Sequence, residues 1–592
     1  MNNRVKFLSN KMFYKRIRMI DGIWYFLTEF TELILVLLFV GLVVLFIYDR
    51  YVQRKHQLII NYPIIGRFRY FFEALREPLR QYFAEETFYE SRDKIDWVYK
   101  AAKNVPNYQS FSVAQPFSGS RFIVKHSINV KNDDEVSDDL SVVFGEKREI
   151  PFKAKSPIVR SAMSDGALSP EAVRAFSLGA LNGDFTLNTG EGSLTSNHLY
   201  TLKPDLDNAK YLEIVKGTPF AQNVFNIIDK VFNRNYAIKI YRKILLHNMR
   251  ESNTFIYNEE NNILFRPNWN APLEDFPKEV PNSLPDMIFQ MSSGLYGVRD
   301  EKGNFDEERY AKVMSFCRMT EIKIAQGAKQ TGGKLSGSKV SVDIAYYRGI
   351  EEGKDLFSPN RFPYADSTEN LFDFIGKLQE ISKKPVGLKI VVSDANVVDE
   401  IFASAYVRKQ AGLPLPDFIS VDSGEGGSAT APLELMESVG LNTTNALYIV
   451  DSLLRKHNLR DDVKIIASGK LLTPDDMIIT MSMGADAVGI ARGFMMSGGC
   501  IRARMCSGYG SHQCPVGMAT QDPKKRASYL VIKKGEEIAN YHVNLLKGMK
   551  TMLAIMGFEK ISQLSKKNLS YKSSNGEIYF DIDKYFKQKL HL

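Results

Sequence analysis

Short apolar runs rich in β-branched residues recur between residues 150 and 492, and each is followed by a Gly- or Ser-rich turn and a stretch with helical periodicity. Runs of this kind are typical of strands buried on both faces of a parallel sheet. Eight strands alternating with helices predict a closed α/β TIM (β/α)8 barrel, and an open doubly wound sheet is the alternative. Because the glycine-rich turns follow the strand C-termini, where barrel sites are built, we favour the barrel. The predicted strands are 156–162, 184–189, 286–291, 321–326, 386–392, 418–423, 463–468 and 487–492.

A longer apolar stretch lies near the N-terminus. Residues 33–48, LILVLLFVGLVVLFIY, carry no charge, and the apolar character extends back to Ile23 if Glu29 and Glu32 lie at a membrane interface. A helix that spans a bilayer needs about 20 apolar residues. We therefore predict a single transmembrane helix at 23–48. A buried core helix is the alternative, and a cleaved signal peptide is disfavoured because no small-residue cleavage site follows.

The predicted helix separates a basic N-terminal segment, 1–22, from the rest of the chain. Lys and Arg flank both ends of the helix, so they leave its orientation open. We expect a single-pass membrane protein whose catalytic domain is cytoplasmic. The remaining parts are a linker and helical extension at 49–149 with a helix at 70–86, a barrel at 150–540 with an insertion at about 200–280, and a helical tail at 541–592.

The insertion contains a basic and aromatic helical stretch, residues 226–250. One interpretation is a solvated helix hairpin on the rim of the barrel. The other is a helix that lies on the membrane surface.

Composition is that of a globular protein. Hydrophobic residues make up 44% and charged residues 24% of the chain, which excludes a disordered or collagen-like protein. The 77 Lys and Arg exceed the 68 Asp and Glu by nine, and both signs are spread along the chain, so we expect no nucleic-acid partner. Four cysteines exclude a disulfide scaffold. Three of them, Cys500, Cys506 and Cys514, are clustered, which indicates a metal site or chance in a reducing compartment.

Glycine-rich segments at three strand ends carry candidate chemistry. In SAMSDGALSPEAVRAFSLGA (161–180), Ser169 is placed to cap a helix. In NTGEGS (188–193), Glu191 lies between two glycines. A third segment, 324–349, surrounds four basic residues with glycines, which suits the capture of a small di-acid, although each turn alone could be an ordinary loop. The four basic residues are Lys329, Lys334, Lys339 and Arg348.

The last two strands end in a pattern typical of phosphate sites. SGKLLTPDD (468–476) follows strand seven and GIARGFM (489–495) follows strand eight. Loops at these two places in barrels often bind phosphate through backbone N–H groups. Lys389 is a charge in the middle of a buried parallel strand and needs a partner, for which a reduced isoalloxazine ring would serve.

Six ordered motifs together resemble the FMN-binding synthase domain of glutamate synthase, and most closely its membrane-anchored, stand-alone members. They are SAMSDGALS, NTGEGS, KIAQGAKQTGGKLSGSKV, RGIEEGKDLFSP, DSGEGGSATAP and GCIRARMC…CPVGMATQDP, and the resemblance covers roughly residues 150–540.

The resemblance implies a barrel of the FMN-binding type with the flavin at its C-terminal mouth. Met163, Gln290, Gln326 and Lys389 would face the flavin, and Ser468, Gly469, Ala491 and Arg492 would hold its phosphate. It further implies that Lys329 and Arg348 bind 2-oxoglutarate and that Glu191 handles ammonia. The expected reaction is FMN-dependent reductive amination of 2-oxoglutarate, or a related dicarboxylate, to glutamate with ammonia or another amine donor.

The sequence departs from the family pattern at two places. The loop after Lys329 is one residue shorter, and Lys334 stands where a glutamine is expected, which adds a positive charge near the substrate. Family members with a [3Fe–4S] cluster show C-x5-C-x4-C, whereas Cys500, Cys506 and Cys514 give C-x5-C-x7-C. These three are the expected cluster ligands, and free or zinc-binding thiols are the alternative. Cys317 is expected to be a buried small hydrophobe.

Two functions of complete glutamate synthases are not expected from this sequence. No cysteine precedes Cys317, so we expect no glutaminase domain, and no GxGxxG motif for NAD(P)H follows a strand. Electrons would then come from a partner, such as a ferredoxin-like protein or a reductase subunit, or from the membrane. Two further hypotheses are a subunit of a methylamine–glutamate N-methyltransferase-like enzyme and a non-catalytic, membrane-tethered flavin or electron-transfer protein.

Overall fold

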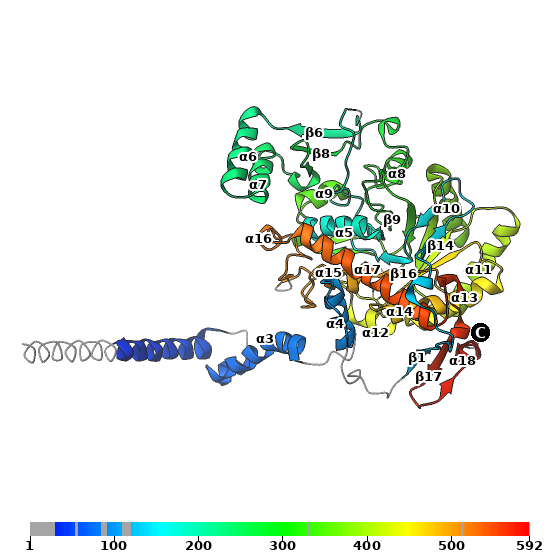
Figure 1. The fold of residues 1–592 in the computed structure, drawn as a ribbon. Helices are drawn as coiled ribbons and strands as arrows, with labels where there is room; N and C mark the ends of the chain where they lie inside the picture. The colour runs from blue at the N-terminus through cyan, green and yellow to red at the C-terminus, as the bar shows by residue number, and fades with distance from the viewer. Residues whose placement is uncertain are drawn as a thin grey trace, which may run out of the picture. The chain divides into compact units, whose positions relative to one another are not determined.

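The computed structural model describes residues 30–53, 57–83, 91–108, 120–207, 209–327, 329, 332–510 and 513–590. It divides into two compact units, Met1–Glu85 and Glu86–Leu592. The second unit contains a closed barrel of eight parallel strands, so the predicted TIM barrel is confirmed (Figure 1). In the order of the chain its strands are β4 (Ile158–Arg160), β5 (Thr186–Asn188), β9 (Met287–Met291), β10 (Met319–Lys323), β13 (Val386–Ile390), β14 (Phe418–Asp422), β15 (Lys464–Ser468) and β16 (Ala487–Ile490).

Every predicted strand corresponds to a strand of the barrel, and β16 pairs with β4 to close it. The fourth strand, expected at 321–326, begins two residues earlier and ends at Lys323. Ser169 caps α5 as expected, because its hydroxyl accepts a hydrogen bond from the N–H of Ala172. The helices after the strands are α5 (Pro170–Gly183), α8 (Glu307–Met314), α9 (Val342–Arg348), α10 (Thr368–Ser382), α11 (Ala395–Gln410), α12 (Leu433–Ser438), α13 (Thr443–Lys456), α14 (Pro474–Ser482) and α15 (Arg492–Ser497).

An apolar floor closes the N-terminal end of the barrel. The hairpin of β2 (Val142–Phe144) and β3 (Phe152–Ala154) precedes the first barrel strand. Its Phe144 ring packs edge-on against Phe418 of β14 at 5.7 Å between centroids. The same cluster holds one apolar side chain from each of six barrel strands: Val159, Ile288, Met319, Phe418, Ile466 and Ala487. Because side chains alternate along a strand, this floor fixes which residues point into the barrel above it.

Segments from both ends of the barrel unit cover its outside. Helix α17 (Val531–Ile555) packs along α5 so closely that a Cβ at Gly179 would lie 2.6 Å from Ile538. Further elements of this unit are α4 (Arg92–Ala102), β1 (Arg121–Val124), β11 (Lys334–Leu335), β12 (Leu356–Phe357) and α16 (Pro523–Arg526). The stretch 541–592, expected as a helical tail, contains the rest of α17 and also β17 (Leu569–Lys572), β18 (Ile578–Tyr579) and α18 (Ile582–Leu590).

The insertion between β5 and β9 is a small α+β subdomain. Its antiparallel sheet has the order β6 (Leu212–Lys216), β8 (Ile263–Pro267), β7 (Ile256–Asn258). Between β6 and β7 the chain forms an antiparallel hairpin of α6 (Pro219–Val231) and α7 (Arg234–Leu245). The sequence pattern indicated the helices, whereas the sheet joins strands about 50 residues apart.

The first unit contains the predicted apolar helix. Phe30–Val52 forms one helix of 23 residues with a mean hydropathy of 2.9, and none of its most apolar stretch is buried. Residues 1–22 and the start of the predicted 23–48 helix lie outside the described residues. The helix ends in a π-turn, Tyr48–Val52, and α2 (Gln57–Asn61) and α3 (Ile65–Phe83) follow. The predicted 70–86 helix overlaps α3 and its last residues lie outside the described part.

Deleting residues 1–85 is expected to give a barrel that is soluble without detergent and unfolds at the same temperature as the full chain. Among the described residues the main core begins at Ile95, so the deletion removes none of it. Thermal unfolding followed by circular dichroism measures this. Extending the deletion to Ala102 is the control, and it should lower the midpoint because Ile95 and Val98 are buried. A 1–85 deletion that aggregates or melts early would show that the first unit contributes to the barrel fold.

Candidate active site

A polar layer lies inside the barrel directly above the apolar floor. Glu321 of β10 is buried, and its Oε1 accepts hydrogen bonds from Asn188 Nδ2 at 2.8 Å and Gln290 Nε2 at 2.6 Å. The hydroxyl of Ser420 donates to Oε2. These contacts join β5, β9, β10 and β14 through one carboxylate. They also fix the predicted site residue Gln290, whose amide nitrogen is engaged by Glu321.

The predicted site residue Lys389 has a carboxylate partner inside the barrel. Its Nζ lies 3.3 Å from Asp422 Oδ2. Asp422 also accepts hydrogen bonds from Ser468 Oγ at 2.8 Å and from the Gly327 N–H at 3.0 Å. Burial alone would lower the pKa of Lys389. The negative charges of Asp422 and Glu321 outweigh this effect and raise the pKa, so the ammonium group stays charged. The partner required by a charge in a buried strand is therefore Asp422.

A cationic cluster surrounds Glu191 at the mouth of the barrel. Lys323 of β10 lies with its Nζ 2.6 Å from Glu191 Oε2. Burial raises the pKa of Glu191, but the ion pair with Lys323 outweighs it and the pKa falls to about 2. A Cβ at Gly333 would lie 2.3 Å from Glu191 Oε1, so a larger residue where the loop after β10 crosses the carboxylate would displace Glu191.

Arg348, the last residue of α9, reaches the same place. Its Nη2 donates to the Asp165 carbonyl at 3.0 Å, and a Cβ at Gly192 would lie 2.4 Å from that nitrogen. Its Nε is buried without a hydrogen-bond partner among the described residues. The neighbouring acids are occupied elsewhere, since Asp343 accepts from Asn253 and Glu351 pairs with Lys354. Arg348 therefore keeps donor capacity for a ligand.

Lys329 is the third buried cation of this cluster. Its side chain is 4% exposed, and its Nζ lies 3.5 Å from Thr430 Oγ1. Burial lowers the pKa of Lys329 to about 8; Lys323 and Lys334 add to the shift, and Glu191 opposes it. Lys334 itself is exposed and lies 5.0 Å from the centroids of the Phe357 and Tyr509 rings. Buried positive charge thus exceeds negative charge at the mouth.

The four residues expected at a phosphate site lie at neighbouring strand ends. Ser468 ends β15 opposite Gly489 of β16, and Ala491 and Arg492 follow β16. Gly469 has φ +143°, and a Cβ there would lie 2.0 Å from the Ser423 hydroxyl. That hydroxyl is buried with no hydrogen-bond partner among the described residues. A turn of small residues beside an unpaired hydroxyl fits a bound anion.

Two further predicted residues belong to the loops of the mouth. The Met163 carbonyl, after β4, accepts a hydrogen bond from Arg160 Nη1 at 3.3 Å. The same Arg160 nitrogen donates to the Asn188 carbonyl at 2.8 Å, so it ties the ends of β4 and β5 together. Gln326 lies in the loop after β10, where its carbonyl accepts from the Lys329 N–H at 3.2 Å.

The three clustered cysteines lie close enough to raise one another's pKa, but as described they are not arranged to bind a metal ion together. Burial raises the pKa of Cys500 to about 11, and Cys506 and Cys514 add to the shift. Within the described residues, which omit 511 and 512 of the intervening loop, no three His, Cys, Asp or Glu side chains are placed to hold a metal ion. Cys317 is fully buried, as expected, and burial raises its pKa to about 12.

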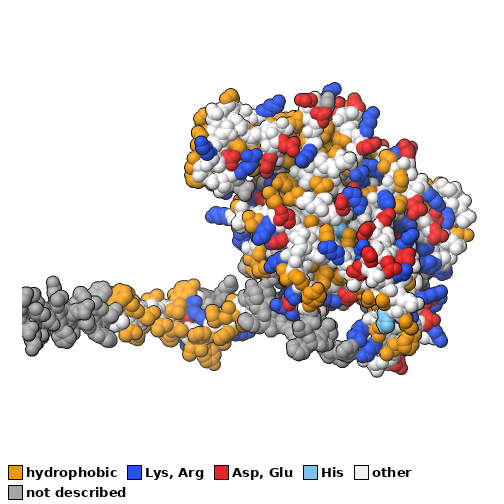
Figure 2. All heavy atoms as spheres, viewed as in Figure 1, with side chains coloured by type: hydrophobic (Ala, Val, Ile, Leu, Met, Phe, Trp, Pro, Cys, Tyr) orange, Lys and Arg blue, Asp and Glu red, His pale blue; other side chains and the backbone are white. Residues whose placement is uncertain are grey.

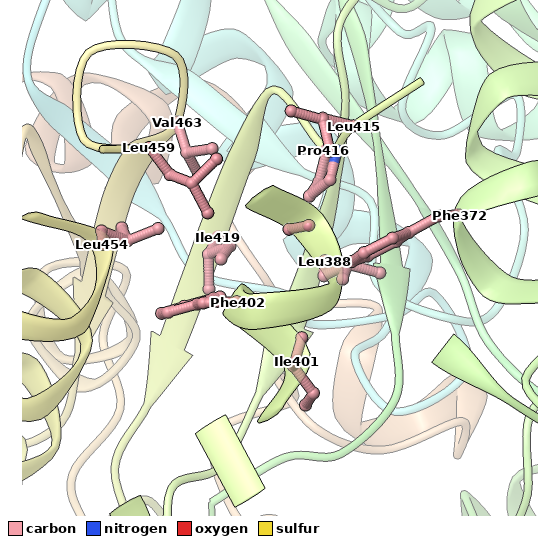
Figure 3. Close-up of a pocket in the computed structure, with 11 residues that line it drawn as sticks. Phe372, Leu388, Ile401, Phe402, Leu415, Pro416, Ile419, Leu454, Leu459 and Val463 are labelled. Atoms are coloured by element: carbon pink, nitrogen blue, oxygen red, sulfur yellow. The ribbon is translucent and has the colours of Figure 1, made fainter. Parts of the chain in front are cut away.

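An apolar cavity of about 10 Å³ lies outside the barrel wall, between β13, β14 and the helices α10, α11 and α13 (Figure 3). Only hydrophobic side chains line it, among them Phe372, Leu388 and Phe402. A site so small and apolar has room for about one water molecule and no group to bind it. This cavity is therefore no candidate for binding a polar ligand.

A closed barrel with a polar interior and a cationic mouth defines the protein as a (β/α)8 barrel with a candidate anion site. Residues 93–559 match the family model described as the conserved region in glutamate synthase. The chain belongs to the glutamate synthase family and is an oxidoreductase of that type.

Known relatives share this family at moderate identity. The chain is 30% identical over 582 residues to the "Glutamate synthase large subunit-like protein YerD" of Bacillus subtilis, covering 90% of this chain and 93% of that protein. It is 33% identical to an archaeal glutamate synthase [NADPH] of Archaeoglobus fulgidus over 49% of this chain and 53% of that one. The chain is also 33% identical to the ferredoxin-dependent glutamate synthase of Cyanidium caldarium; that match covers 50% of this chain and 18% of the relative.

Solved structures match this chain at low sequence identity. A mutant flavocytochrome b2 with pyruvate bound has a TM-score of 0.37 and 13% identity, over 84% of this chain and 85% of that chain. Similarity at this level supports no inference about the reaction.

Replacing Lys323 by Met is expected to lower the free energy of unfolding by about 1.5–3 kcal/mol, because Glu191 would lose the charge-assisted hydrogen bond from Lys323 Nζ and keep only the more distant charges of Lys329 and Arg348. The double variant K323M/E191Q should recover most of that loss. Urea unfolding of the detergent-solubilised chain measures both. The contribution of the pair is fully present above pH 4.5, the ordinary pKa of a glutamate, and is lost as the pH falls towards 2.

The matched control is Lys377→Met, which removes an exposed ion pair with Glu307 and should cost less than about 1 kcal/mol. A double variant no more stable than K323M would show that the two residues act independently.

Proposed function

We propose that this protein is an FMN-dependent glutamate synthase-type enzyme that reductively aminates 2-oxoglutarate to glutamate. The observation that carries the proposal is the cluster in which Lys323, Lys329 and Arg348 surround Glu191. Three buried cations facing one carboxylate leave an excess of positive charge that a small dicarboxylate would neutralise. A mouth of this kind is rare unless it binds an anion, because each buried ion needs compensation.

The barrel interior fits a flavin. Ser468, Gly469, Ala491 and Arg492 would hold its phosphate, where the buried Ser423 hydroxyl has no partner among the described residues. Met163, Gln290, Gln326 and Lys389 would lie against its ring system. When bound, FMN supplies hydride transfer. Because Glu321 engages the amide nitrogen of Gln290, the amide oxygen is the atom left to accept a hydrogen bond from a ligand.

The mouth residues would bind and orient the substrates. Arg348 has an unpaired Nε and a guanidinium plane suited to a carboxylate, and Lys329 would bind the second carboxylate. A lysine with a pKa of about 8 can also exchange a proton at Nζ near neutral pH. Glu191, kept ionised by Lys323, would attract an incoming ammonium ion, but with a pKa of about 2 it is too weak a base to take the proton. Lys329 in its neutral form is the better matched base.

The proposal also covers the domain boundaries, the membrane location and the electron donor. The barrel domain spans 150–540, the helix at Phe30–Val52 is a single membrane span, and the barrel is cytoplasmic. Electrons come from a separate donor, a ferredoxin-like protein or a reductase subunit; the first is in keeping with the name of one relative. A [3Fe–4S] cluster on Cys500, Cys506 and Cys514 rests on their spacing alone, since the described thiols form no ligand set.

Arg348→Ala is expected to weaken 2-oxoglutarate binding about 10- to 100-fold, because a charge-assisted carboxylate contact with arginine contributes roughly 1.5–3 kcal/mol. Titration of the flavin absorbance of the FMN-loaded protein with 2-oxoglutarate measures the affinity. The FMN content should not change, since the phosphate residues lie on other loops. Arg361→Ala, which removes an exposed arginine paired with Asp366, is the matched control.

Equal affinities for Arg348→Ala and the unchanged protein would remove the dicarboxylate assignment and leave the flavin assignment standing. A flavin response to methylamine with glutamate, and none to 2-oxoglutarate, would favour the N-methyltransferase-like alternative.

If the three cysteines hold an iron–sulfur cluster, Cys500→Ser, Cys506→Ser and Cys514→Ser should each abolish iron binding after anaerobic reconstitution. Cys317→Ser is the matched control and should leave iron content unchanged, because that thiol is buried in the core. Iron analysis and the visible spectrum measure the result. A reconstituted unchanged protein without iron would end the cluster proposal and favour free thiols.

A further inference from the structure

The α6–α7 hairpin carries an apolar face that no described residue of the barrel unit covers. Phe220, Ile227 and Val231 lie on one side of α6 at helical spacing, with exposed fractions of 73%, 63% and 65%. Phe232, in the turn between the helices, is 68% exposed and contacts the ring of Tyr236. Figure 2 shows hydrophobic side chains along the outer edge of this hairpin. Four large apolar side chains in one small area need a physical explanation.

This outer face is not an unfilled part of the hairpin's own core. The opposite faces of the two helices already pack together through Ala221, Phe225, Ala237 and Tyr241, all buried. Both helices are capped, α6 by the Thr218 hydroxyl and α7 by the Asn233 side chain. The hairpin is thus a complete element that presents its apolar face outward.

The segment that contains this hairpin is strongly basic. Residues 216–250 contain seven Lys and Arg and one Asp, a net charge of +6, against +9 for all 592 residues. Lys230, Lys239 and Lys243 are exposed and form no ion pair within the described part of the chain. Arg234 is balanced by Asp229 and Glu259, and Arg250 by Glu352. Positive charge thus flanks the apolar face.

We propose that the α6–α7 hairpin docks on an anionic lipid surface. Exposed aromatic and aliphatic side chains flanked by lysines are the features of helices that lie in the headgroup region of a bilayer. A protein partner fits less well, because lysine is depleted from protein–protein interfaces. The chain also carries a candidate membrane span at Phe30–Val52. The hairpin would be a second, peripheral membrane contact made by the barrel domain itself.

The test uses the full chain in nanodiscs of phosphatidylcholine alone or of phosphatidylcholine with a minority of phosphatidylglycerol. Both hold the span, so any difference between them reports on the hairpin. Amine acetylation followed by mass spectrometry measures the reactivity of individual lysines. Lys230, Lys239 and Lys243 are expected to react several-fold more slowly in the anionic nanodisc. Lys147, 82% exposed on the β2–β3 hairpin, is the internal reference.

Variants separate the lipid contact from other causes. Ile227→Ser with Val231→Ser should abolish the protection, and Val407→Ser, which changes a 66% exposed valine on α11, should leave it intact. Equal reactivity in the two nanodiscs would overturn the proposal. Protection that appears in detergent and rises with protein concentration would also overturn it, in favour of contact with a second copy. A chain that fails to enter either nanodisc would refute the membrane span. The lysines would then be tested with added vesicles. Protection by anionic but not by neutral vesicles would still support docking of the hairpin, and no protection by either would overturn it.

Discussion

The hydrogen bonds to the buried carboxylate of Glu321 hold together the part of the barrel on which the site depends. They reach Asn188, Gln290 and Ser420, so one side chain links four strands. Because side chains alternate along a strand, an inward Glu321 also turns Met319 and Lys323 inward. Met319 then completes the apolar floor below, and Lys323 pairs with Glu191 at the mouth above. A shift of β10 by one residue would remove all three contacts at once.

Charge compensation explains the layers above the floor. Lys389 is paired by Asp422, which also receives the Ser468 hydroxyl and the Gly327 N–H, so it connects the loop after β10 to the end of β15. Glu191 is compensated by Lys323, whereas Arg348 and Lys329 have no carboxylate in contact among the described residues. Under the proposed function, these two cations would bind the carboxylates of the substrate beside Glu191.

Much of the fold could be predicted from the sequence because its strands are continuous apolar runs. The eight barrel strands and the Ser169 cap followed directly from pattern. Glu321, Lys323 and Asp422 were missed, since charges inside such runs look like interruptions. The available signal was the spacing of two between polar residues on one strand, Glu321 and Lys323 on β10 and Ser420 and Asp422 on β14. The sheet of the insertion was also missed, because β6 and β8 pair across about 50 residues and no local pattern encodes that contact. The structure brings the expected residues of the mouth together. The arrangement of the three cysteines depends instead on the conformation of the loop between them, which the spacing of the cysteines alone does not determine.

The central claim is that the barrel mouth brings a dicarboxylate and an amine to a reduced flavin. The most direct measurement is a single-turnover reaction of the FMN-loaded full chain, reduced without oxygen and mixed with ammonium and 2-oxoglutarate. The account predicts one glutamate formed for each flavin reoxidised, and neither product when 2-oxoglutarate or ammonium is left out. A flavin that stays reduced, with no glutamate formed at 2-oxoglutarate concentrations that saturate binding, would contradict it.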